Sequence, residues 1–267
     1  MKKILCVVGF VVLAAQIPLW GFDTSPSSLQ IVPEAIWAEA TGGGTWVTEL
    51  EIISLGDTAA DVLVYFDYAG GSAGPFQVTT ALAKFRCVTF TNILSVLDAL
   101  DSSGFVYFGR VGALRVQTAD SNSRIHAQAK TVNGNYGKTF PGVNVIAGNV
   151  AAHGYSMMIQ GFVRNATYRT SAGIYNPSAT YTFTVRLQIF DPNENQVGST
   201  FDRILPPHGF LSFNPFVQAG ITSGTYDSCW FFIQVVEEVI PLEGVISYAS
   251  LANNYTNDTY ALLPKKR

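Results

Sequence analysis

The five residues from Gly70 to Gly74 match the pattern Gly-x-Ser-x-Gly, which carries the nucleophilic serine of many hydrolases. In those enzymes the serine lies on a sharp turn between a strand and a helix, and this turn exposes its hydroxyl. Here residues 62–66 are typical of a strand, and residues 75–79 are typical of another strand instead of a helix. The sequence therefore favours a flexible hairpin loop over a hydrolase site.

A second oxygen-rich pattern has the Asp-x-Asn-x-Asn spacing of a calcium loop. Its four residues are Asp191, Asn193, Asn195 and Asp202. A calcium loop also requires glycine at its sixth position, usually a glutamate at its twelfth, and flanking helices. Gln196 occupies the sixth position and the flanks are typical of strands. The set is a weak calcium candidate, and the alternative is a polar turn held by side-chain hydrogen bonds.

The other titratable residues do not combine into a site. The three histidines have no metal-ligand spacing and are not near the cysteines in sequence: His126, His153 and His208. Glu237 and Glu238 are adjacent, and adjacent residues on a strand face opposite sides, so they cannot form a facing acid–base pair. We therefore predict no catalytic residue, no metal site of the zinc type and no cofactor.

Aromatic residues make up 13% of the chain. A carbohydrate-binding module stacks sugar rings on exposed aromatic side chains, whereas most aromatic residues of a β protein pack in its core. Trp37 and Tyr255 have the sequence settings least typical of a strand core, so they are the candidate ligand-binding residues. Trp46 and Tyr168 begin equivalent strands, and we expect both to be buried.

The composition excludes several classes of protein. The 267 residues include 16 Lys+Arg and 19 Asp+Glu, for a net charge of -3, and only 13% of residues are charged against about 25% in typical soluble domains. A chain with 48% hydrophobic residues is too apolar to be disordered, and it lacks the basic surplus of a nucleic-acid binder. Three cysteines are too few for a disulfide-stapled fold of this length.

The first 21 residues are typical of a cleaved secretory signal. Lys2 and Lys3 precede an uncharged apolar run, and Gln16 and Pro18 interrupt that run before it reaches the length of a membrane span. No later segment is apolar enough to be a transmembrane anchor. We therefore expect an exported protein, in the periplasm, outside the cell or at the cell surface.

Two cysteines remain after residue 21, and they lie in different apolar runs. An exported protein keeps disulfides, so Cys87 and Cys229 could pair. Their separation in the chain favours the alternative, two separately buried thiols.

Strand patterns dominate the rest of the chain. Residues 62–66 and 105–108 are β-branched and aromatic, and residues 124–130 and 182–190 alternate polar and apolar side chains. Residues 92–100 are the one good helix candidate. The sequence thus predicts an all-β fold with antiparallel sheets.

The chain also matches itself at an offset of 120 to 124 residues. Thr45–Thr48 recurs as Thr167–Thr170, which is 122 residues later. The further matches are Ile52–Leu55 with Ile174–Pro177, Tyr65–Asp67 with Ile189–Asp191, Leu82–Lys84 with Leu205–Pro207, Val88–Phe90 with Leu211–Phe213, and Ile125–Asn133 with Val245–Asn253. These matches predict two tandem modules, residues 22–144 and 145–267.

The order of these motifs resembles a repeat of secreted bacterial proteins that is similar to tandem immunoglobulin-like β-sandwich modules. The motifs are Thr-Trp-x-Thr at 45–48, Gly-Ala-Leu-Arg-Val at 112–116, residues 131–141, Tyr-Arg-Thr at 168–170, Asn-Pro at 176–177, Pro-Pro-x-Gly at 206–209 and Tyr-Ala-Ser at 248–250. Ser54-Leu55 replaces the usual Asn-Pro of the first repeat, and Lys138 replaces a common Gln, so we expect altered turn geometry there. The resemblance implies export and a β-sandwich, and it transfers no catalytic residue.

These observations predict a non-enzymatic structural or interaction protein that presents β-sandwich modules to a protein partner or to another copy of itself. The alternative is a carbohydrate-binding or adhesive module, and a secreted hydrolase is less well supported. The low charge also predicts that one face of the modules is covered by another surface.

Overall fold

The computed structural model describes residues 24–40, 43–145, 151–152, 156–237, 244–256 and 258–266. The described chain is mostly β-strand, and every pair of neighbouring strands is antiparallel. The prediction of an all-β fold is therefore confirmed. The predicted signal, residues 1–21, lies outside the described residues.

The first half of the chain forms one continuous sheet that folds over on itself. Its elements are β1 (Leu29–Glu39), β2 (Thr45–Ser54), β3 (Ala60–Tyr68), β4 (Gly71–Leu82), β5 (Cys87–Phe90), α1 (Ile93–Leu100), β6 (Arg110–Thr118), β7 (Ile125–Asn133) and β8 (Tyr136–Pro141). The strand order is β4-β3-β6-β1-β2-β7-β8, and β5 pairs with β2. Strand β1 pairs with β6 over most of its length and with β2 only at its end, where Ala38 lies opposite Trp46.

The second half forms two separate sheets. Its elements are β9 (Met157–Arg164), β10 (Tyr168–Tyr175), β11 (Phe183–Phe190), β12 (Phe201–Leu205), β13 (Phe210–Phe213), α2 (Pro215–Gln218), β14 (Tyr226–Val235), β15 (Ile246–Asn253), β16 (Thr259–Leu262) and β17 (Lys265–Lys266). One sheet has the order β12-β11-β14-β9-β17 and the other has the order β13-β10-β15-β16.

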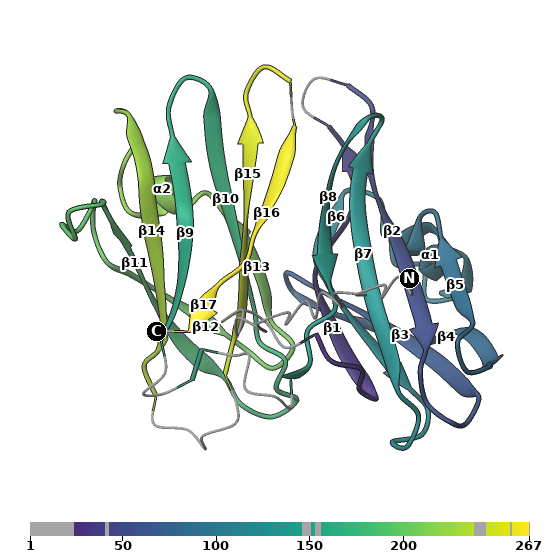
Figure 1. Ribbon diagram of the computed structural model, residues 1–267. Helices are drawn as coiled ribbons and strands as arrows, with labels where there is room; N and C mark the ends of the chain where they lie inside the picture. The colour runs from purple at the N-terminus through teal and green to yellow at the C-terminus, as the bar shows by residue number, and fades with distance from the viewer. Residues whose placement is uncertain are drawn as a thin grey trace, which may run out of the picture.

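The second half repeats the strand pairing of the first. The order β4-β3-β6-β1 corresponds to β12-β11-β14-β9, and β5-β2-β7-β8 corresponds to β13-β10-β15-β16. Figure 1 shows the two halves side by side, with β10, β13, β15 and β16 of the second half next to the first half and β9, β11 and β14 on its far side. The predicted division between residues 144 and 145 lies between β8 and β9.

Each half has its own hydrophobic core, built by alternating side chains. In β3 the residues Val62, Val64 and Phe66 are fully buried and their neighbours Leu63 and Tyr65 are half-buried. This period of two turns every second side chain toward the core. The same pattern runs along β11. Burial of each such side chain contributes about 1.5–3 kcal/mol to folding.

A threonine joins the two layers of strands in each half. The Thr48 hydroxyl accepts a hydrogen bond from the Ile36 backbone N–H at 2.7 Å and donates to the Ile36 carbonyl at 3.1 Å. The Thr170 hydroxyl makes the same two contacts with Val163, both at 2.9 Å. The Thr-x-x-Thr repeat in the sequence therefore corresponds to a repeated side-chain link between strands, which satisfies buried backbone groups.

The turn after β4 also recurs after β12. The Ser54 N–H donates to Arg86 in the first half, and the Asn176 N–H donates to Gly209 in the second. The third turn residue has a left-handed backbone in both, at Phe85 (φ 60°) and His208 (φ 55°). The expected change of backbone geometry at Ser54 is thus not seen in these hydrogen bonds.

The difference at this turn lies in the side chains. The Asn176 amide donates to the carbonyls of Tyr181, Leu205 and Pro206, at 2.7, 3.1 and 2.9 Å. The buried Ser54 hydroxyl has no hydrogen-bond partner in the described part of the chain. The asparagine therefore links the end of β12 to the residues before β11, whereas the serine provides no such side-chain donor.

The predicted helix at residues 92–100 is confirmed as α1, and Asn92 caps it by accepting from Ser95 N–H. Asn214 caps the four-residue α2 in the same way. The predicted strand at residues 105–108 is wrong, because these residues form an irregular loop before β6. The segment contributes packed aromatic rings and no sheet hydrogen bonds. Phe105 stacks on Tyr68 with the ring centroids 4.6 Å apart, and Tyr107 is buried.

Candidate functional site

A buried group of charged and polar side chains lies where the two halves meet. We call this contact the seam: β1, β6 and β8 of the first half pack against β10, β13, β15 and β16 of the second. Its buried apolar residues are Ile31, Ala113, Phe140, Val143, Tyr175, Phe210, Ile246 and Tyr248. The seam is therefore a third core, made by sheet faces that would otherwise be exposed.

A glycine on β10 permits the closest approach in the seam. A Cβ atom at Gly173 would lie 2.1 Å from the ring of Tyr248, so any larger residue would displace that ring. The Tyr248 ring, which lies over Gly173, packs edge-to-face on Phe140 of the first half, with the ring centroids 5.2 Å apart. The aromatic contact across the seam thus depends on the absence of a side chain at Gly173.

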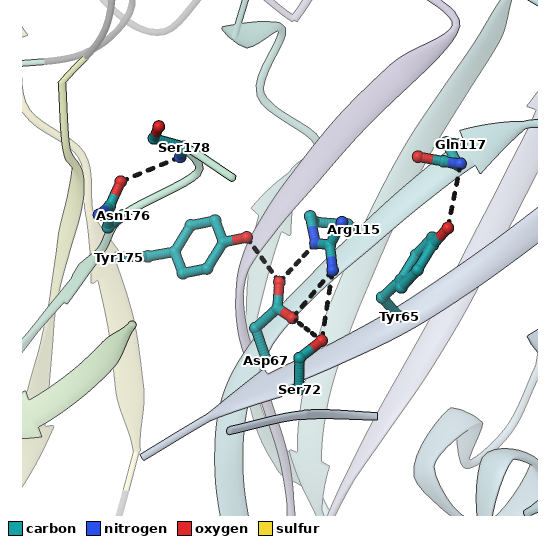
Figure 2. Close-up of polar contacts among 8 residues, drawn as sticks. All are labelled: Tyr65, Asp67, Ser72, Arg115, Gln117, Tyr175, Asn176 and Ser178. Atoms are coloured by element: carbon teal, nitrogen blue, oxygen red, sulfur yellow. Dashed lines mark hydrogen bonds and ion pairs between the residues drawn. The ribbon is translucent and has the colours of Figure 1, made fainter. Parts of the chain in front are cut away.

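A buried carboxylate on β3 collects four hydrogen bonds from both halves. Figure 2 shows Asp67 between Arg115 of β6, Ser72 of β4 and Tyr175 of β10. The carboxylate accepts from Arg115 Nε at 2.6 Å, from Arg115 Nη2 at 3.2 Å, from the Ser72 hydroxyl at 2.5 Å and from the Tyr175 hydroxyl at 2.5 Å. We call this group the Asp67 bridge, because Tyr175 reaches it from the second half.

The charges of the Asp67 bridge are shielded from water. Asp67 is fully buried, the Arg115 side chain is 13% exposed, and the guanidinium lies 4.0 Å from the ring centroid of Tyr65. The Tyr65 hydroxyl is held in turn by Gln117 (Figure 2). A bidentate pair with a stacked guanidinium fixes both distance and orientation, which a single point charge cannot do.

The surroundings of the bridge keep its groups in one protonation state. Burial, with the negative charge of Asp67, raises the pKa of Tyr175 well above its usual value, so the phenol stays a donor. Burial, the largest single cause, lowers the pKa of Arg115, but the hydrogen bond to Asp67 and the charge of Asp67, with smaller contributions from Tyr175 and Tyr65, together outweigh it, so the net pKa is raised. Burial and the charge of Arg115 lower the pKa of His208. At neutral pH Arg115 therefore stays charged and Tyr175 stays protonated.

A second buried ion pair lies elsewhere in the seam. Lys138 Nζ on β8 is 2.7 Å from the Glu34 carboxylate on β1 and donates to the Ser250 hydroxyl of β15 at 2.6 Å. Both charged side chains are at most 10% exposed. Removing one partner of such a pair costs about 3–5 kcal/mol, because the other charge stays buried. Both ion pairs lie within the first half, and each makes one hydrogen bond to the second, with Tyr175 and with Ser250.

The Gly-x-Ser-x-Gly pattern contributes to the Asp67 bridge and not to a nucleophile elbow. Residues 75–79 are in a strand, as predicted. That strand, β4, already begins at Gly71, so the expected flexible hairpin loop over residues 70–74 is wrong, and Ser72 is the second residue of the strand. Its hydroxyl donates to Asp67 and accepts from Arg115 Nη2 at 3.3 Å. The side chain therefore has a structural role at the base of the hairpin.

The two carboxylates among the four calcium candidates are engaged within the protein. Asp191 accepts from the backbone of Asn193 and Asn195 and from the Asn195 amide. Asp202 pairs with Arg186 through two hydrogen bonds of 3.1 and 3.0 Å. This loop is the predicted polar turn. Hydrogen bonds lower the pKa of Asp191, and the one from the Asn195 side-chain amide has the largest effect. Within the described ranges no group of three His, Cys, Asp or Glu side chains could hold a metal ion.

The remaining titratable candidates are dispersed. His126 Nδ1 lies 3.1 Å from the Thr24 carbonyl. Glu237 accepts twice from the Thr184 N–H at 2.7 Å. His153 and Glu238 lie outside the described residues. The structure thus brings none of these groups together with the Asp67 bridge except His208.

The two ring candidates differ in exposure. Tyr255 lies at the tip of the β15–β16 turn and is 74% exposed. Trp37 is half-buried and packs edge-to-face on Phe108 at 5.4 Å. The expectation that Trp46 and Tyr168 are buried is wrong, because both are half-buried near strand ends. Tyr255 is therefore the more accessible of the two predicted rings.

The two cysteines are unpaired, as the favoured interpretation predicted. The same interpretation predicted that both thiols are buried, and this is wrong for Cys87. Cys229 is buried, and burial raises its pKa to about 11. Cys87 is exposed because it lies on the outer side of the edge strand β5.

Sequence reasoning did not find the residues of the seam. Asp67, Arg115 and Tyr175 are 48 and 108 residues apart in the chain, so no local spacing connects them. Asp67 did mark the end of a repeated strand, and a charged residue in such an apolar strand is the available signal. Glu34 and Lys138 gave no comparable signal.

No protein-family model matches the chain, and no curated protein or solved structure matches it either. Within the described residues, no helix is both long and apolar enough to cross a membrane.

Proposed function

We propose that the chain is an exported, non-enzymatic structural or interaction protein of two tandem immunoglobulin-like β-sandwich modules, residues 22–144 and 145–267. It works at the cell surface or in the periplasm. The signal pattern of residues 1–21 supports export, and the repeated strand order supports the pair of modules. The family resemblance of the motifs agrees with both.

An aromatic outer face on the second half carries this proposal. In β14 the residues Phe231 and Ile233 belong to the core, so Trp230 and Phe232 lie on the opposite side of the sheet. Phe190 of β11 stacks on Trp230 with the ring centroids 4.3 Å apart. Ile204 of β12 is 68% exposed. We call these four residues the outer face.

The corresponding sheet of the first half supports one occupant for the outer face. There β3, β6 and β1 turn the equivalent side toward the seam, where strands of the second half cover it. On this face Ile204 stays exposed, and Phe190 and Phe232 are only half-buried. We infer that a sheet of a second copy of the chain covers it, because that is the surface which covers its counterpart.

The use of the polar groups supports a non-enzymatic role. Ser72 and Asp67 are bound to each other and to Arg115, and Asp202 is bound to Arg186. A hydrolase needs a nucleophile and a general base that are open to substrate, whereas Asp67, the acceptor of the Ser72 hydroxyl, is fully buried and also accepts from Arg115 and Tyr175. The contacts of these side chains instead stabilise the hairpins and the seam.

Sedimentation velocity of the purified chain tests the proposal. We expect reversible association below about 100 µM, the range of a weak but specific interface. Exchange of Phe190 and Trp230 for threonine keeps strand propensity and removes the stacked rings, so this double variant should sediment as a monomer. The control Val106→Thr changes a 61% exposed residue of the first half and should associate like the wild type. A wild-type monomer at every concentration would overturn the proposal.

A further inference from the structure

A pocket opens in the first half beside the turn between β3 and β4. Its volume is about 400 Å³, within the range of about 300–1,000 Å³ that is typical of small-molecule sites. The lining comes from Tyr68 at the end of β3, from residues 72–76 at the start of β4, and from Asp101, Ser103 and Phe105 between α1 and β6. All of these residues lie in the first half, so the pocket is distinct from the seam.

Asp101 alone among the residues that line the pocket carries a charge. Its half-buried carboxylate accepts from the Ser103 N–H at 2.8 Å and from the Tyr107 hydroxyl at 2.9 Å, and both donors are neutral. Within the described part of the chain, no lysine or arginine forms an ion pair with this carboxylate. The negative charge of Asp101 is therefore available to a cation in the pocket.

The surroundings of Asp101 keep its carboxylate ionised at neutral pH. Hydrogen bonds from the Ser103 hydroxyl and then from the Ser103 N–H lower the pKa of Asp101. Burial, the hydrogen bond to Asp101 and the charges of Asp101 and Asp98 raise the pKa of Tyr107, so that hydroxyl stays a donor. An ionised carboxylate has about four acceptor sites, so Asp101 can also accept from a ligand.

The aromatic rings of the pocket are those of Tyr68, Phe76 and Phe105. Tyr68 and Phe105 stack with their centroids 4.6 Å apart, and the Arg110 guanidinium lies 5.6 Å and 5.3 Å from the two centroids. The face of an aromatic ring attracts cations, as the position of Arg110 illustrates. Phe76 packs edge-to-face with Tyr107, and no cationic side chain of the described residues lies over its ring. The Phe76 ring is therefore a further surface for a cation.

We propose that the pocket binds a small organic cation with an alkylated ammonium group, which contacts the aromatic rings and pairs with the carboxylate of Asp101. Rings together with one carboxylate suit such a cation, because a neutral ligand leaves the charge unbalanced and an anion is repelled by it. Trp37 and Tyr255, the candidates from the sequence, do not line this pocket. The proposal does not involve the outer face, so it and the proposed association can fail separately.

An NMR titration of the purified, 15N-labelled chain tests the proposal with two matched probes. Choline carries a trimethylammonium group, and 3,3-dimethylbutan-1-ol has the same shape with a neutral carbon in place of the nitrogen. We expect choline to bind with a dissociation constant below about 1 mM and at least about tenfold more tightly than the alcohol, because only choline gains cation–π and ionic contacts. The backbone amide signals that shift should belong to residues 72–76 and 101–105. Absence of choline binding, equal affinity for both probes, or shifts confined to other residues would overturn the proposal.

Two aspartate variants separate the charge of the pocket from its shape. Asp101→Asn keeps an acceptor for Ser103 and Tyr107 but removes the charge, so the preference for choline over the alcohol should fall to less than about threefold. The matched control Asp98→Asn removes an exposed charge that lies on α1 and does not line the pocket. It should change the affinity for choline by less than about twofold, because water and salt screen exposed charges. An undiminished preference for choline in Asp101→Asn would by itself overturn the proposal.

Discussion

The same sheet carries opposite surfaces in the two halves. In the first half, the side of β3 and β6 that faces away from the core carries Asp67 and Arg115, and the second half covers it. In the second half, the same side of β11 and β14 carries Phe190 and Trp230. Identical strand order therefore does not imply an identical role, because the neighbour of each outer surface determines which side chains it uses.

Burial gives the correct alignment of these strands. Phe66 and Ile189 are both fully buried, so they correspond at an offset of 123, one less than the offset of 124 that the sequence match suggested. Asp67 then corresponds to Phe190. In the pairing register Asp67 lies opposite Ala113, and Phe190 lies opposite Trp230. Asp67 of the bridge and Phe190 of the stacked pair thus occupy the same position of the repeat, and Trp230 takes the position of Ala113.

The largest expected difference in stability is between a variant of the buried ion pair of the first half and a variant of the exposed ion pair of the second. Asp67→Asn leaves the Arg115 charge buried without its partner, so the free energy of unfolding should fall by about 3–5 kcal/mol. Asp202→Asn removes the partner of Arg186, whose side chain is 44% exposed, and should cost at most about 1 kcal/mol. Urea denaturation followed by circular dichroism measures both. Equal losses would show that the Asp67 bridge is not buried from water.

The threonine links provide a comparison in which the halves should agree. Thr48→Val and Thr170→Val each keep the shape of the side chain and leave a backbone N–H and carbonyl without their partner. Each should lower the free energy of unfolding by about 1–3 kcal/mol. The same urea experiment applies. A loss in only one of the two variants would contradict the equivalence of these links.

A smaller effect is expected for the hydrogen bond that crosses the seam. Tyr175→Phe removes one of the four donors to Asp67, while Arg115 and Ser72 remain, so the loss should be about 1–2 kcal/mol. The control Tyr181→Phe changes a ring at the surface and should have no measurable effect. Thermal unfolding curves of both variants provide the test, and equal melting temperatures would contradict the assigned role of Tyr175.

The cysteines provide a comparison without any change in stability. Cys87 of β5 is exposed, and Cys229 of β14 is buried with its pKa raised to about 11. In a Cys6→Ser background at pH 8, a thiol reagent should modify Cys87 rapidly and Cys229 only after denaturation, because the thiolate is the reactive form. Two thiols that react in the native protein would contradict the burial of Cys229.

The strands were predictable where alternation was strong and local. Residues 124–130 and 182–190 alternate cleanly, and both segments are strands in the structure. Residues 105–108 have equally strong strand composition, but Tyr107 donates to Asp101 and its ring enters the core from a loop. Strand propensity could not reveal this loop, because the position of Tyr107 depends on tertiary packing around α1.

The seam was predictable only as a general suspicion from the low charge. Its residues come from strands of both halves, and each half alone gives no reason to choose one sheet face over the other. The repeat even conceals the seam, since it suggests that the two halves have the same surfaces. Only the packing of the halves shows why Asp67 and Phe190 differ.

A double-mutant cycle between Asp67→Asn and Tyr175→Phe tests most directly whether the seam joins the two halves energetically. The unfolding free energies of the wild type, the two single variants and the double variant are measured in urea. We predict that Tyr175→Phe loses most of its effect once Asp67 has been changed, with a coupling energy of about 1 kcal/mol or more. Effects that add within about 0.3–0.5 kcal/mol would contradict the account, because the Tyr175 hydroxyl would then be independent of Asp67.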